Sequence, residues 1–169
     1  MTETILKMQK KVKRYLDKDR YDHTIGVMHT AGCLAMRYGA NLEQALTAGL
    51  LHDCAKCVPA DEKIKLCEKN HIEISDAEYK NPGLLHAKLG AFFAREKYGI
   101  ENEEILRSIE SHTTGRPNMS LLDKIIYIAD YIEPGRDVAP NLPEVRALAF
   151  VDIDACLYRI LEDTLTYLA

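Results

Sequence analysis

The sequence predicts an all-α, single-domain protein, because of its length, its apolar periodicity and the residues that end its helical segments. The chain has 169 residues, of which 47% are apolar and 28% charged. This length supplies one hydrophobic core but does not divide comfortably into two full-sized domains. Apolar residues recur at intervals of three and four through most of the chain, as in amphipathic helices, and no strand-like alternation of useful length occurs. We therefore expect a single helical bundle over residues 1–169.

The first half of the chain contains four helical segments. Residues 3–16 place their apolar side chains on one face, and residues 21–38 form a second pattern that ends at Gly39. Asn41, with Gln44 three residues later, is typical of an N-cap, and the helix that follows cannot extend far beyond Pro59. Residues 61–69 favour a short helix, and residues 70–83 favour a loop.

The second half continues the helical pattern. Residues 84–98 form a helix that stops at Gly99, and residues 102–112 form another. Ser120 resembles an N-cap for a helix that ends before Pro134. The last segment, residues 143–168, changes its apolar phase near Asp152, so we expect two helices there.

Charge and composition exclude several classes of function. The net charge is −4 and the isoelectric point is about 5.9, so the chain lacks the basic field that drives binding to nucleic acid. No apolar run approaches the length of about 20 residues that spans a bilayer, so no membrane partner is expected. The N-terminal segment does not resemble a secretory signal, and five scattered cysteines favour reduced thiols. These features predict a cytoplasmic protein.

Six residues form a candidate metal centre, and five different predicted helices supply them. Imidazole and carboxylate ligands suit iron or manganese better than structural zinc, and one aspartate could bridge two metal ions. His29 and His71 are interpreted as ordinary structural histidines. The predicted ligands are His23, His52, Asp53, His86, His112 and Asp130.

The order of these ligands resembles that of the HD-domain metal-dependent phosphohydrolases, H…HD…H…H…D. Four segments, at 20–24 (RYDHT), 51–56 (LHDCAK), 112–115 (HTTG) and 131–137 (YIEPGRD), further resemble the YqeK-type branch of that family. The resemblance implies an HD-type helical bundle with a ligand-bearing core at about 20–137 and a C-terminal helical segment at about 143–168. It also implies a binuclear iron centre and a small-molecule nucleotide substrate. That substrate would be diadenosine tetraphosphate, cleaved symmetrically to two ADP.

Four residues are candidates for catalysis. Two cations could polarise phosphoryl oxygens and lower the pKa of a water to give a hydroxide near neutral pH, with Asp53 as bridging ligand. Lys56, one turn beyond Asp53, is predicted to face the incoming phosphate. Arg136 could clamp a phosphate, and Asp137 could orient Arg136 or the catalytic water.

Other interpretations remain open at this point. Arg20 and Arg116 are weaker candidates that neutralise ligand carboxylates or pair on the surface. Cys54 and Cys57 form a CxxC pair that is interpreted as structural, since no second pair accompanies it. The alternatives are another HD-type nucleotide phosphatase or phosphodiesterase, a di-iron oxidoreductase, and a non-catalytic nucleotide or metal sensor. The oligomeric state is open, and a helical domain of this size could form a homodimer.

Overall fold

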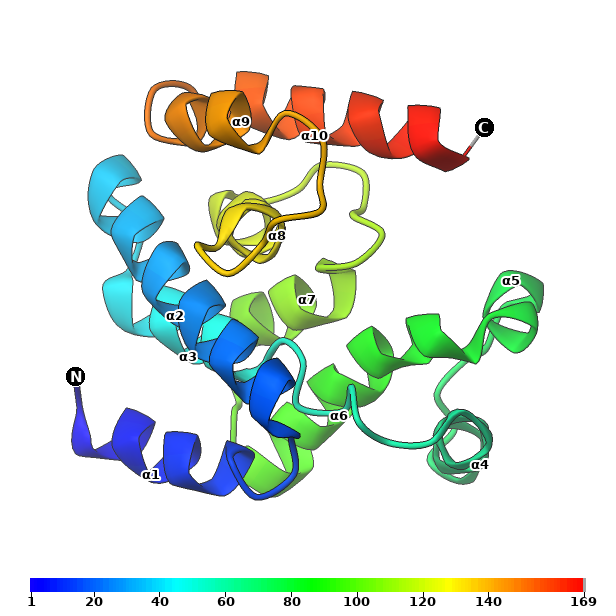
Figure 1. The fold of residues 1–169 in the computed structure, drawn as a ribbon. Coiled ribbons are helices and arrows are strands. Elements are labelled where there is room, and N and C mark those ends of the chain that lie inside the picture. The colour runs from blue at the N-terminus through cyan, green and yellow to red at the C-terminus, as the bar shows by residue number, and fades with distance from the viewer. Residues whose placement is uncertain (169) are drawn as a thin grey trace.

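A computed structural model describes residues 1–168 and confirms the all-α fold (Figure 1). The described residues form α-helices joined by short connections and one short 3-10 helix, with no strand among them. The elements are α1 (Glu3–Val12), α2 (Lys18–Tyr38), α3 (Leu42–Leu51), α4 (Ala60–Lys69), α5 (Asp76–Lys80), η1 (Pro82–Leu85), α6 (His86–Tyr98), α7 (Glu103–Ser111), α8 (Leu121–Ile132), α9 (Leu142–Ala149) and α10 (Ile153–Leu168).

The helix ends follow from local chemistry that the sequence predicted. The side chain of Asn41 accepts a hydrogen bond from Gln44 N, and Ser120 forms a capping box with Asp123. Gly39 and Gly99 end α2 and α6 with φ angles of 71° and 68°, in the left-handed region where a side chain would be strained. These caps fix where the helices stop, and the predicted ligands lie near several of those stops.

Helix α8 forms the centre of the bundle. It packs against α2, α3 and α7 on one side and against α9 and α10 on the other (Figure 1). Ile125, Ile126 and Ile128 are fully buried, as expected for a helix that is covered on several faces. α2 and α3 approach closely at Gly49, which has no side chain. A Cβ there would lie only 2.9 Å from Met28 Cα. This close approach brings the ligand-bearing parts of α2 and α3 together.

The structure differs from the sequence prediction in three places. α1 ends at Val12 instead of near residue 16, and α2 begins at Lys18 instead of near residue 21. Asp17 explains the earlier start, since its side chain caps the new N-terminus by accepting from Arg20 N. The predicted loop at 70–83 contains α5 and the start of η1, and η1 occupies the first positions of the helix predicted at 84–98. The break near Asp152 is confirmed, because α9 ends at 149 and α10 begins at 153.

None of the helices that residues 1–168 form is long and apolar enough to cross a lipid bilayer.

Candidate metal centre and active site

The six predicted ligands meet in one buried cluster, because the ends of several helices converge on it. His52 and His112 are the C-caps of α3 and α7, and His86 is the first residue of α6. Asp130 lies in the last turn of α8, and His23 projects from α2. The structure therefore assembles in space what the sequence distributes over more than one hundred residues, from 23 to 130.

Three of the histidines are oriented by the same local hydrogen bond. The Nδ1 atoms of His52, His86 and His112 lie 2.7, 2.6 and 2.7 Å from the carbonyl oxygens three residues upstream. A carbonyl only accepts, so each Nδ1 donates its proton, and each ring turns its Nε2 toward the cluster. Ligating histidines are commonly oriented in this way.

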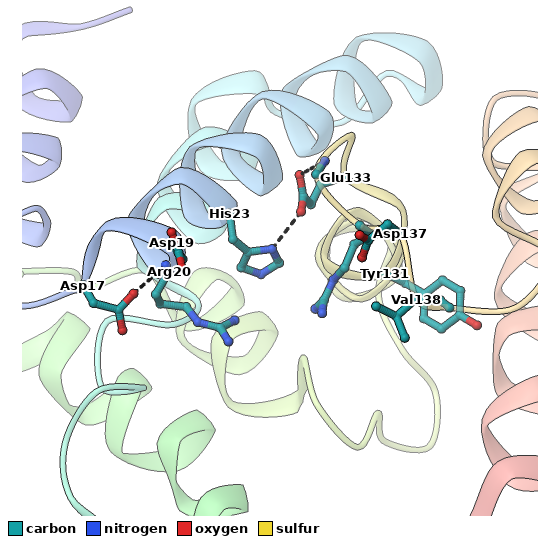
Figure 2. A pocket seen from close by; sticks show the side chains of 11 residues that line it. Asp17, Asp19, Arg20, His23, Tyr131, Glu133, Asp137 and Val138 are labelled. Carbon is teal, nitrogen blue, oxygen red and sulfur yellow. Dashed lines mark hydrogen bonds and ion pairs between the residues drawn. The ribbon is translucent and has the colours of Figure 1, made fainter.

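His23 is oriented instead by a residue that the sequence analysis missed, Glu133. Its Oε1 lies 3.0 Å from His23 Nδ1, and its Oε2 accepts from Gly135 N at 2.6 Å (Figure 2). Glu133 is 3% exposed. Gly26 leaves the space for this carboxylate, because a Cβ there would lie 2.3 Å from Glu133 Oε2. The one sequence signal for Glu133 is its place in the YIEPGRD segment, directly before Pro134 and Gly135.

Asp53 stands between two groups of imidazoles and turns one oxygen to each. Its Oδ2 lies 3.5 Å from His52 Nε2 and 4.0 Å from His23 Nε2. Its Oδ1 lies 3.2 Å from His86 Nε2 and 3.5 Å from His112 Nε2. Such an arrangement suits a carboxylate that bridges two cations.

The cluster fits a pair of metal ions by three further criteria. Two sets of ligand atoms, from His23, His52 and Asp130 and from His52, Asp53 and His112, each lie within 4.8 Å of one another. Buried polar atoms without hydrogen-bond partners include His23 Nε2, His52 Nε2 and Asp53 Oδ1, all of which face the cluster. The donor set of imidazole nitrogen and carboxylate oxygen matches first-row transition metals.

The electrostatics of the cluster attract positive charge, as the pKa shifts of its members show. Burial lowers the pKa of His52 to about 4, so its imidazole is neutral at neutral pH. Burial alone would raise the pKa of Asp53, but the neighbouring imidazoles hold it well below its ordinary value. Burial would lower the pKa of His112, yet Asp53 raises it, which shows that the carboxylates attract positive charge to this point.

Three cationic side chains surround the ligands. Lys56 Nζ lies 3.3 Å from His86 Nε2, so this lysine lies beside the cluster, and its contact with a phosphate stays a prediction. Arg20, a weaker candidate from the sequence, donates from Nη1 to Asp53 Oδ2 at 2.8 Å. Arg136 donates from Nη2 to Asp130 Oδ1 at 2.7 Å and from Nε to Asp130 O at 2.9 Å.

Asp137 and Arg116 lie outside the ligand cluster. Asp137 was expected to orient Arg136 or a catalytic water; the guanidinium of Arg136 binds Asp130, and Asp137 is an exposed residue that lines the pocket, so its role toward water stays a prediction. Arg116, the other weaker candidate, pairs with Asp123 at the start of α8. Asp123 is fully buried and is not one of the predicted ligands, so Arg116 pairs with a buried carboxylate outside the cluster.

A second residue that the sequence analysis missed holds the loop after α8. Arg146 of α9 donates from Nε to Ile132 O at 2.9 Å and from NH2 to the carbonyl oxygens of Glu133 and Arg136 at 2.9 and 2.8 Å. These three acceptors belong to the segment that carries Glu133 and Arg136. These hydrogen bonds join residues that are ten to fourteen positions apart, and their acceptors are backbone carbonyls. No sequence motif therefore predicts them.

A pocket of about 610 Å³ lies beside the cluster, and of the six predicted ligands His23 lines it (Figure 2). Its wall combines acidic and basic side chains with an apolar end. In Figure 2 the imidazole of His23 lies between Arg20 on one side and Tyr131 with Val138 on the other. The lining residues are Asp17, Asp19, Arg20, His23, Tyr131, Glu133, Gly135, Arg136, Asp137, Val138 and Ala139.

Fold and site together define a helical domain with an H…HD…H…H…D ligand cluster, and comparison with known proteins agrees. The HD domain family matches residues 20–135, and this chain belongs to that family. It is also similar to curated relatives named "Bis(5'-nucleosyl)-tetraphosphatase, symmetrical". The relative from Halalkalibacterium halodurans is 45% identical over 157 residues, which are 93% of this chain and 83% of that protein. The one from Bacillus subtilis is 41% identical, with the same coverage.

A solved structure supports the same assignment. The crystal structure of a predicted HD superfamily hydrolase involved in NAD metabolism, from Clostridium acetobutylicum, superimposes with a TM-score of 0.91 at 43% identity. The match covers 95% of this chain and 85% of that one. The resemblance to the HD-domain phosphohydrolases is thereby confirmed.

Proposed function

We propose that this protein hydrolyses dinucleoside tetraphosphates symmetrically, converting diadenosine tetraphosphate and water to two ADP. The names of the relatives at 45% and 41% identity support this substrate and this position of cleavage. The observation that carries the chemistry is the placement of Asp53, whose two oxygens face different pairs of imidazoles. A carboxylate so placed would offer one oxygen to each of two metal ions, which would supply an activated water for phosphoryl transfer.

The ligand set divides into two groups in this proposal. One ion would be held by His23, His52 and Asp130, the other by His86 and His112, with Asp53 between them as the bridge. When bound, the two cations would polarise phosphoryl oxygens and activate water near neutral pH. The donor atoms suit iron, which the family resemblance implies, and also manganese.

The remaining polar residues would act on the phosphate chain. Positive charge beside the ligands comes from Lys56, Arg20 and Arg136. This charge would stabilise the negative charge that develops on the transferred phosphoryl group. The guanidinium groups present planar donor pairs that match phosphate oxygens. Asp137, at the wall of the pocket, could accept a hydrogen bond from water or substrate there. A polyphosphate lying over His23 would contact cations on both sides.

These cations also favour a hydrolase over the alternative functions. A di-iron oxidoreductase or a sensor could use the same ligands, but neither needs three basic side chains beside them. A small anionic nucleotide does need them. The five cysteines are all free thiols in the structure, in keeping with the proposal of a reducing, cytoplasmic setting.

The proposal is tested by metal analysis together with turnover. Protein purified without oxygen should contain about two transition-metal ions per chain, and a chelator should abolish cleavage of the phosphate bond until metal is restored. The Asp53→Ala variant should lose metal and turnover together, since charge and geometry fail at once. Turnover that needs oxygen and leaves the phosphate bonds intact would establish the oxidoreductase alternative.

A further inference from the structure

The pocket above the metal centre changes chemical character along its length. Near His23 it is lined by the guanidinium groups of Arg20 and Arg136, which suit phosphate. At the other end it is lined by Tyr131, Val138 and Ala139, whose side chains carry no charge. A ligand that fills the whole pocket therefore has a charged part and a planar or apolar part.

Tyr131 is held in place before any ligand arrives. It follows the ligand Asp130 on α8, so the helix fixes its distance from the metal centre. Its half-buried ring packs against the hydrophobic core and lines the pocket. A ring that is already ordered loses little conformational entropy when a flat partner stacks on it.

Val138 provides the second surface. With 91% of its area exposed, it is the most exposed of the large hydrophobic side chains within residues 1–168. A side chain exposed to that extent contributes little to packing and is free to contact a ligand in the pocket. It lines the same pocket as Tyr131, and both lie on the same side of His23 in Figure 2.

We propose that Tyr131 and Val138 form a nucleobase subsite, in which the base of the bound nucleotide lies against the tyrosine ring and the valine side chain. The proposal rests on the proposed function and adds where the nucleoside of that substrate binds. With the base at this end, its 5'-phosphates extend toward His23 between Arg20 and Arg136. Stacking tolerates any base and grows with ring area, so the subsite favours purine over pyrimidine nucleoside diphosphates.

The test measures binding instead of turnover. Dissociation constants of ADP and of inorganic pyrophosphate are determined by calorimetry on the metal-loaded protein, with metal content as a check on the site. The Tyr131→Ala variant should raise the dissociation constant of ADP by about tenfold, the size expected for one stacked base. The dissociation constant of pyrophosphate should be unchanged. Tyr131→Phe should restore ADP binding, because it keeps the ring. Equal loss for both ligands, or no loss for ADP, overturns the subsite.

A second pair of variants guards against misfolding. Val138 is too exposed for its replacement to affect the fold. Val138→Ser should therefore raise the dissociation constant of ADP by about threefold, through lost apolar contact alone. The matched controls, Tyr158→Ala and Val151→Ser, remove side chains that are 69% and 70% exposed and lie outside the pocket. They should leave both ligands unchanged, and an effect of Val138→Ser equal to that of Val151→Ser contradicts the proposal.

The same data separate the subsite from the proposed function. If Tyr131→Ala and Val138→Ser weaken ADP binding selectively but the wild-type protein releases AMP and ATP from diadenosine tetraphosphate, the subsite is supported and symmetric cleavage is contradicted. If neither variant changes ADP binding, there is no subsite here, whatever products the protein forms.

Discussion

Replacing Gly26 by alanine should damage the metal centre without damaging the fold. The new Cβ would lie 2.3 Å from Glu133 Oε2 and 3.1 Å from its carboxyl carbon. Ordinary contact begins near 3.4 Å, so the carboxylate would have to move by about 1 Å. Its hydrogen bond to His23 Nδ1, now 3.0 Å, lies near the middle of the allowed range and would be lost by such a movement away from the ring.

The expected effect on metal binding follows from the role of Glu133. Loss of a group that orients a ligating histidine typically weakens metal affinity by about 10- to 100-fold, or about 1.4–2.8 kcal/mol. The fold responds differently, because alanine inside a helix is more favourable than glycine by about 1 kcal/mol. This gain offsets part of the cost of displacing the buried carboxylate. The melting temperature of the metal-free protein should thus shift by only a few degrees.

Competition with a chelator of known affinity measures the metal affinity, and thermal unfolding in excess chelator measures the fold. Gly32→Ala is the matched control, since it lies on the same helix and its Cβ would come closer than ordinary contact only to the movable end of Leu46, 2.9 Å away at Cδ2, with Leu42 Cδ1 at 3.5 Å. The control should bind metal as the wild type does. If Gly26→Ala also does so, the carboxylate of Glu133 does not support the site and the reasoning fails.

Three further changes test other parts of the site. The Lys56→Ala variant should retain its metal and lose about 100-fold in kcat/KM, because one charge beside the phosphate is removed; metal loss would make Lys56 structural instead. The Arg146→Met variant should bind metal more weakly, with recovery on addition of guanidinium ion, whereas a variant that no guanidinium rescues would show a general packing defect. Thiol titration of the native protein should modify Cys33 and Cys57 rapidly and spare Cys54, whose pKa burial raises to about 12; rapid modification of Cys54 would refute its burial.

The fold was predictable because most helix boundaries are set by local capping interactions. Asn41, Gly39 and Gly99 mark their helix ends through caps that involve residues no more than a few positions away. The short α5 was missed, since five residues give too little periodicity, although Ser75 and Glu78 form a capping box there. Local signals thus predicted the longer helices and failed for the shortest.

The six candidate metal ligands could be chosen for a different reason, which is their order along the chain, and the structure brings them together. Residues that position those ligands were harder to find, because their contacts are distant in sequence. Glu133 meets His23 across 110 residues, and Arg146 binds backbone carbonyls that any residue could supply. Arg20 was underrated because its partner Asp53 lies 33 residues away on another element. Only packing of the helices reveals such pairs.

The most direct test of the account is the identity of the first products from diadenosine tetraphosphate. Chromatography of an early time point with metal-loaded protein should show ADP as the dominant nucleotide and no matching appearance of ATP. Chelator-treated protein and the Asp53→Ala variant serve as controls and should form neither. AMP and ATP in equal amounts would contradict symmetric cleavage, and ADP formed equally by the Asp53→Ala variant would contradict the assignment of the metal centre as the active site.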